Sequence, residues 1–140
     1  MRRPFLATLF LLGPLAMTAR GELKTEEVRY SHGGTEFVGY LAYDDRFEGE
    51  RPGVLVVHEW WGLNDYAKKR AEQLAGLGYV AFAADMYGGG QVFEHPREAG
   101  AMAGKVRENV RTWRGRAQAA LDALKKHEKV DESRLAAIGY

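Results

Sequence analysis

The 140-residue sequence contains no cysteine and no marked excess of charge of either sign. Without cysteine the chain forms no disulfides, so a hydrophobic core has to hold the fold together. Its 20 basic and 19 acidic side chains give a formal net charge of +1. Proteins that bind nucleic acid carry a clear basic excess, so the charge balance argues against that class of function.

The signatures of two further kinds of site are also missing. The four histidines, His32, His58, His95 and His127, have no spacing that suggests a metal site. Gly88-Gly89-Gly90 matches neither of the glycine-rich patterns that bind nucleotide phosphates, so we interpret it as a flexible loop at the rim of a pocket. We therefore expect neither a metal centre nor a phosphate-binding loop.

The first residues have the pattern of a targeting segment. Arg2-Arg3 precedes an apolar run from Phe5 to Met17, and Ala19-Arg20-Gly21 offers small residues for cleavage. This order predicts a secretory signal peptide over residues 1–21, since the run falls short of the roughly 20 residues of a transmembrane helix. An uncleaved membrane anchor and a wrongly chosen start codon are the alternatives.

Removing the signal peptide leaves one domain over residues 22–140, with 17 basic and 19 acidic side chains. We expect that domain to be secreted or periplasmic and to have no stable membrane association after cleavage. Its length corresponds to one domain or part of one. The sequence does not indicate an oligomeric state.

The mature sequence alternates between strand and helix patterns. The expected strands are Val28–Tyr30, Thr35–Tyr43, Gly53–Val57, Tyr79–Ala83 and Leu135–Ile138; the expected helices run from Asp65 to about Ala75, from Pro96 through Val106, and onward to about Lys126. Gly33-Gly34 predicts a turn that makes the first two strands a hairpin. The other three strands are continuous apolar runs, typical of a parallel sheet buried on both faces. We therefore predict an α/β fold, a mostly parallel sheet with an N-terminal antiparallel hairpin.

Local signals place the helices more closely. Asn64 is a good N-cap for the first helix, whose buried face carries alanines at helical spacing. The last helix has an apolar stripe, and its arginines and lysines are expected on the solvated face. The stripe consists of Val110, Trp113, Ala117, Ala120, Leu121 and Leu124.

Candidate site residues follow the carboxyl ends of the strands, where open α/β sheets form their sites. The segments there are His58–Asn64, Asp85–Gly90 and Gly139-Tyr140. An apolar strand followed by Gly-Tyr is how a G-x-S-x-G nucleophile elbow begins, and the loop after the third strand supplies an oxyanion-hole N–H in α/β-hydrolases. We therefore expect that the chain ends after the fifth strand, one residue before a nucleophile. The fifth strand would then be an exposed apolar edge, and the 140-residue chain would be poorly stable.

Three stretches of the chain carry a specific likeness. They are Val56-Val57-His58-Glu59-Trp60-Trp61-Gly62-Leu63-Asn64, Ala84-Asp85-Met86-Tyr87-Gly88-Gly89 and Ile138-Gly139-Tyr140. With them the chain resembles the dienelactone hydrolase family of the α/β-hydrolase superfamily, from about Val28 to the C-terminus. The adjacent tryptophans and carboxylate of the first stretch are its strongest element.

The resemblance implies a hydrolase that acts on a small-molecule ester or lactone and needs no cofactor. Its Cys or Ser nucleophile would follow Tyr140, with an Asp and a His downstream, so the triad is absent from these 140 residues and the chain alone is expected to be inactive. Glu59 would set the protonation of the nucleophile, and the backbone N–H of Trp60 would form half of the oxyanion hole. Trp61 and Tyr87 would lie at the substrate pocket.

Plainer interpretations stay open. Glu59 would then be a surface carboxylate or a partner of Arg70, and at least one of Trp60 and Trp61 is expected to be a core aromatic. We interpret His58 as a hydrogen-bonded structural residue and not as a base. For the whole protein, the alternatives are a non-catalytic α/β ligand-binding module with a pocket at the strand ends, and a nucleotide- or flavin-binding domain.

Overall fold

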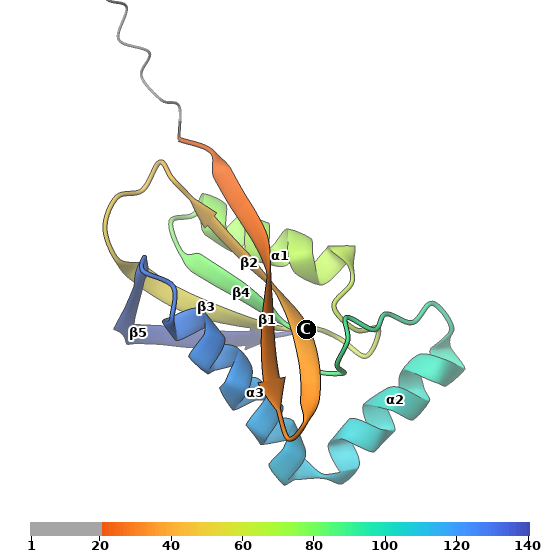
Figure 1. Cartoon of the computed structure of the whole chain (residues 1–140). Coiled ribbons are helices and arrows are strands. Elements are labelled where there is room, and N and C mark those ends of the chain that lie inside the picture. The colour runs from red at the N-terminus through yellow and green to blue at the C-terminus, as the bar shows by residue number, and fades with distance from the viewer. Residues whose placement is uncertain (1–20) are drawn as a thin grey trace, which may run out of the picture.

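The structure, a computed structural model, describes residues 21–140 (Figure 1). The predicted signal peptide therefore lies outside the described residues, apart from Gly21. Within the described part, the strands form one sheet in the order β1-β2-β4-β3-β5. The elements are β1 (Leu23–His32), β2 (Thr35–Asp44), β3 (Arg51–Val57), α1 (Asp65–Gly76), β4 (Val80–Ala84), α2 (Pro96–Glu108), α3 (Val110–Lys125) and β5 (Val130–Gly139). The predicted α/β fold is confirmed.

The N-terminal hairpin has longer arms than its sequence pattern indicates. β1 and β2 pair antiparallel from Leu23 opposite Asp44 to His32 opposite Thr35. The turn residues Gly33 and Gly34 have φ angles of 58° and 78°, in the left-handed region that glycine adopts without strain. A two-residue turn of this kind suits the twist of the two strands and fixes their register.

The parallel part of the sheet is built around β3. This strand pairs in parallel with β4 on one side and with β5 on the other. β2 pairs antiparallel with β4 and so attaches the hairpin to the parallel strands. The carboxyl ends of β3, β4 and β5 consequently lie at one edge of the sheet, near the C-terminus marked in Figure 1.

The helices α1 and α3 cover opposite faces of the sheet. Leu55 and Phe82 pack in one cluster with Leu124 of α3. Their neighbours Val56 and Ala81 pack in a second cluster with the alanines of α1. Since successive side chains of a strand point to opposite faces, the two clusters lie on opposite sides. Figure 1 shows α2 apart from the sheet, beside the start of α3.

The first helix begins as expected. The Asn64 side chain accepts a hydrogen bond from the Ala67 N–H at 3.2 Å and so caps α1. The buried face of this helix is made of Ala67, Ala71 and Ala75, small residues that let the helix lie close to the sheet. β4 starts one residue later than expected, because the Tyr79 N–H donates to the Leu74 carbonyl at the end of α1 at 3.2 Å.

The last strand is the free edge of the sheet in the described chain. β5 pairs with β3, and no other strand of residues 21–140 lies against its outer side. Leu135 is half-buried, whereas Ala136, Ala137 and Ile138 are exposed. The expectation of an exposed apolar edge is thus confirmed for residues 136–138, whereas Leu135 packs against the core.

The predicted stripe of α3 is wrong in its first half. Val110 and Trp113 are 53% and 41% exposed, while Ala120 and Leu124 are fully buried. The first turn of α3 follows directly on the end of α2 at the tip of the hairpin, and α3 packs on the strands from about Gly115 onward. Arg116 also departs from the expected solvated face: it is half-buried, and its Nη1 donates to the Met86 carbonyl at 2.7 Å.

Candidate active site at the carboxyl ends of the strands

The loop after β3 makes a tight turn. The Gly62 N–H donates to the Glu59 carbonyl at 3.4 Å, and Gly62 has a φ angle of 93°. A Cβ atom on Gly62 would clash with the carbonyl oxygen of Gln91, so glycine is required for close approach as well as for conformation. The Phe93 N–H donates to the Trp61 carbonyl at 2.9 Å. This loop is therefore fastened to the loop that follows β4.

His58 lies buried at the end of β3, with both ring nitrogens occupied. Its Nε2 accepts from the Met86 N–H at 3.1 Å, and its Nδ1 lies 2.5 Å from the Glu59 carbonyl oxygen. Because a backbone N–H only donates and a carbonyl only accepts, the ring is neutral with its proton on Nδ1. Burial lowers the pKa of His58, in agreement with that state. The structural interpretation of His58 fits this arrangement.

Asp85, at the end of β4, is fully buried and organises the glycine loop. Its Oδ1 accepts from the N–H groups of Tyr87 and Gly88, both at 2.9 Å. Its Oδ2 accepts from Gly90 at 2.8 Å and from Val38 of β2 at 3.2 Å. Sequence reasoning missed this role. An aspartate directly before a glycine-rich turn, where it bonds backbone N–H groups a few residues on, is the signal for it.

Tyr87 connects the loops after β4 and β3. Its hydroxyl donates to the Trp60 carbonyl at 2.7 Å, and its ring packs edge-on against His58 with ring centres 4.8 Å apart. Burial raises the pKa of Tyr87, so the hydroxyl keeps its proton. The Tyr87 hydroxyl therefore holds the backbone of the loop that carries Glu59 and Trp60.

A cavity of about 230 Å³ lies over the strand ends and collects most of the predicted site residues. Glu59, Trp60 and Tyr87 line it together with Gly139 and Tyr140. The other lining residues are Val57, His58, Met86, Ala103, Val106, Arg107 and Trp113. The Glu59 side chain is exposed, and within residues 21–140 it has no hydrogen bond or ion pair.

The suggested ion pair between Glu59 and Arg70 does not form. Arg70 instead donates from Nε to the Tyr140 hydroxyl at 2.8 Å, and its guanidinium lies 4.8 Å from the centre of the Tyr140 ring. Tyr66 packs edge-on against the same ring. Two residues of α1 thus fix the Tyr140 side chain, and Glu59 lines the cavity without an ion pair to Arg70.

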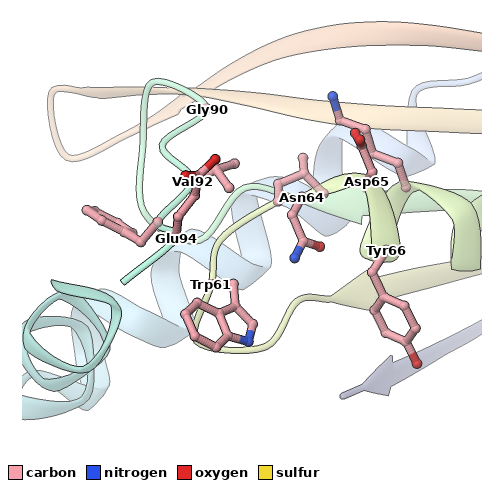
Figure 2. A pocket seen from close by; sticks show the side chains of 10 residues that line it. Trp61, Asn64, Asp65, Tyr66, Gly90, Val92 and Glu94 are labelled. Carbon is pink, nitrogen blue, oxygen red and sulfur yellow. The ribbon is translucent and has the colours of Figure 1, made fainter. Parts of the chain in front are cut away.

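A second hollow, of about 610 Å³, lies on the other side of the loop after β3. Figure 2 shows Trp61 and Tyr66 on one side of it, the Asn64 amide between them, and Val92 and Glu94 on the segment opposite. Trp61 lines this hollow and Tyr87 lines the smaller one, so the two predicted pocket residues do not share a cavity.

The expectation that Trp60 or Trp61 is a core aromatic is wrong. Trp60 is 40% exposed and Trp61 is half-buried. Their ring centres lie 4.9 Å apart, and the two rings contact different hollows. Both tryptophans thus lie outside the core, on the loop after β3.

Two other kinds of feature are absent from the described part of the chain. Among residues 21–140, no three His, Asp or Glu side chains gather in a way that would hold a metal ion. None of the helices in that range is long and apolar enough to cross a membrane.

Known proteins share this fold. A model of the dienelactone hydrolase family matches residues 37–140. The crystal structure of P91, a dienelactone hydrolase-like promiscuous phosphotriesterase from metagenomic libraries, is 44% identical with a TM-score of 0.80. A structure named m3DLH is also 44% identical, with a TM-score of 0.81. The alignment with each covers 84% of this chain and 49% of the other.

A curated protein is also similar to part of this chain. Protein usf of Aquifex pyrophilus is 36% identical over 85 residues, which are 59% of this chain and 35% of that protein. The chain thus spans about half the length of the similar structures and about a third of this relative. The family match includes the strand ends that carry Glu59, Tyr87 and Tyr140. The chain belongs to the dienelactone hydrolase family.

Proposed function

We propose that the protein to which this chain belongs is an exported hydrolase of carboxylic esters or lactones. Its nucleophile, a Cys or Ser, would follow Tyr140, and an Asp and a His further along would complete the triad. The observation that carries the proposal is the cavity over the strand ends, where Glu59, Trp60 and Tyr140 meet. Family membership supports hydrolysis as the reaction class.

In this mechanism the nucleophile gives its proton to the triad histidine, attacks the carbonyl carbon of the substrate and forms a tetrahedral oxyanion. The oxyanion collapses to an acyl-enzyme as the C–O bond to the alcohol breaks and the histidine protonates the leaving oxygen. The Trp60 N–H is one donor to that oxyanion, and a well-aimed donor of this kind contributes about 3–4 kcal/mol. Water then releases the acid. No metal or organic cofactor takes part in these steps.

Glu59 would control the charge of the nucleophile. Glu59 lines the cavity, and its carboxylate has no partner in the described chain. A carboxylate close to a thiol disfavours a second negative charge, so it keeps the nucleophile neutral until substrate displaces or shields it. We further propose that the substrate extends over Tyr87 in the small cavity and over Trp61 in the larger hollow.

The test uses protein expressed from the complete reading frame, with an activated aryl ester and an unsaturated lactone as substrates. An aryl phosphotriester is added because the similar protein P91 is a promiscuous phosphotriesterase. We expect Glu59→Gln to lower kcat/KM for the preferred ester or lactone roughly 100-fold, the lower end of the range for a side chain that controls protonation at the reacting groups.

Glu48→Gln, which changes an exposed loop carboxylate, is the matched control for Glu59→Gln. This variant should keep the kcat/KM of the parent protein. Equal activity of both variants, or no turnover by the complete protein, would exclude the proposal in favour of a ligand-binding module.

A further inference from the structure

We infer that His58 and Tyr87 are positioning residues that hold the peptide groups of Glu59 and Trp60 so that the Trp60 N–H faces the cavity. This inference rests on the proposed function, in which that N–H binds the oxyanion. Neither residue contacts substrate atoms in this arrangement, because each acts through the backbone of the turn after β3.

Three carbonyl groups of the turn after β3 each have a partner within the protein. The Glu59 carbonyl accepts from His58 Nδ1 at 2.5 Å and from the Gly62 N–H. The Trp60 carbonyl accepts from the Tyr87 hydroxyl, and the Trp61 carbonyl from the Phe93 N–H. A carbonyl dipole that turned toward a developing oxyanion would repel it, so holding these three oxygens elsewhere favours the reaction.

The direction of the Trp60 N–H follows from the Glu59 carbonyl. A peptide group is planar and trans, so its C=O and N–H point in opposite directions. The Glu59 carbonyl shares a peptide group with the Trp60 N–H, and it is bound by the buried His58 ring. The Trp60 N–H therefore points away from His58. Within residues 21–140 it has no hydrogen-bond acceptor.

His58 and Tyr87 form one unit. Their rings pack edge-on, and the Met86 N–H bound to His58 Nε2 belongs to the residue before Tyr87. Asp85 in turn binds the Tyr87 N–H, so the whole unit is anchored at the end of β4. A rigid anchor matters because an oxyanion donor works only when it is fixed before the reaction.

Two substitutions of His58 separate its two hydrogen bonds. His58→Asn leaves an amide N–H near the position of Nδ1 and keeps the donor to the Glu59 carbonyl. His58→Gln extends a carbonyl oxygen toward the position of Nε2 and keeps only the acceptor for the Met86 N–H. In the complete protein we expect His58→Asn to retain most of kcat and His58→Gln to lose roughly tenfold or more with little change in KM. Retention of kcat by His58→Gln would overturn the inference.

Tyr87→Phe removes the hydroxyl and keeps the ring. We expect roughly a tenfold loss of kcat with KM nearly unchanged, because a loosened donor weakens the transition state more than the ground state. Tyr40→Phe is the matched control, since its hydroxyl also donates a hydrogen bond, to the Glu72 carboxylate at 2.8 Å, away from the turn. A similar loss of kcat in both tyrosine variants would show a general effect on stability and would contradict the inference.

The tautomer of His58 gives a readout that does not depend on activity. Nitrogen-15 NMR of the imidazole should show a protonated Nδ1 and an unprotonated Nε2 at neutral pH. A proton on Nε2 would overturn the inference even in an active enzyme. If the complete protein shows the expected tautomer but hydrolyses no substrate, the proposed function is excluded, whereas the role of His58 in positioning the turn still stands.

Discussion

At the scale of single residues, the buried polar side chains at the strand ends bind backbone groups. Asp85 accepts four backbone N–H bonds, and His58 and Tyr87 hold the carbonyls of the turn after β3. A buried donor or acceptor that loses its partner costs about 1–3 kcal/mol, so these residues shape the loops more firmly than surface polar residues do.

Replacing Asp85 with asparagine should therefore destabilise the fold. The amide would present an NH₂ group to backbone N–H donors, so at least one oxygen acceptor is lost and donors face each other. We expect the free energy of unfolding to fall by about 2–3 kcal/mol, measured from urea midpoints at unchanged slope. Asp122→Asn, which alters an exposed carboxylate bonded to Gln118, should change it little. Equal shifts for the two variants would contradict the assigned role of Asp85.

At the scale of elements, the join between the hairpin and the parallel strands depends on a glycine. Gly39 of β2 lies under the ring of the fully buried Phe82 of β4, and a Cβ atom on Gly39 would clash with that ring. The ring has no room to move in a close-packed core. We therefore expect Gly39→Ala to lower the free energy of unfolding by roughly 1–3 kcal/mol through overpacking.

Gly104→Ala is the contrasting control for that substitution. Gly104 lies inside α2, and a Cβ atom there would meet nothing within 4 Å. Alanine has the higher helix propensity, so this variant should gain up to about 1 kcal/mol. Opposite signs of the two shifts in thermal or urea unfolding are the expected result, and a Gly39→Ala variant as stable as the parent chain would refute the packing argument.

At the scale of the whole molecule, stability should depend on pH through two histidines. Burial lowers the pKa of His58 and of His127 below the ordinary value of 6.5. At pH values between 6.5 and the pKa values of the folded state, the unfolded chain therefore binds more protons than the folded chain. The free energy of unfolding consequently falls as the pH drops below about 6.5. We expect a lower urea midpoint at pH 5.5 than at pH 7.5, and a smaller difference in a His58→Asn, His127→Asn double variant. If the double variant shows the same difference in urea midpoint between the two pH values, groups other than these two histidines cause the pH dependence.

The free edge at β5 should make the 140-residue chain self-associate. Ile138 is 38% exposed on a strand whose outer side has no partner among residues 21–140. Apolar edge strands pair with other chains, so association should increase with concentration. Ile138→Lys should shift sedimentation toward the monomer, whereas Val110→Lys, at a still more exposed helical position, should not. Monomeric behaviour of the unaltered chain at high concentration would contradict this.

The sequence by itself determined the order of the elements and their local ends. The apolar runs located β3 and β4 within two residues, Gly33-Gly34 located the hairpin turn, and Asn64 located the start of α1. These features depend on neighbours in the chain, because backbone conformation, capping and strand alternation are decided within a few residues. The motif around Glu59 also identified the family without a structure.

Only the tertiary structure decided how distant residues meet. It set Trp60 and Trp61 at different hollows, paired Arg70 with Tyr140 instead of Glu59, turned Arg116 toward the loop after β4, and brought His58 and Tyr87 to the same turn. Most of these contacts join residues far apart in the chain, so they depend on strand order and on where a helix runs past the sheet. The hydrophobic periodicity of a sequence predicts which residues of an element are buried, but it does not predict which other element covers them.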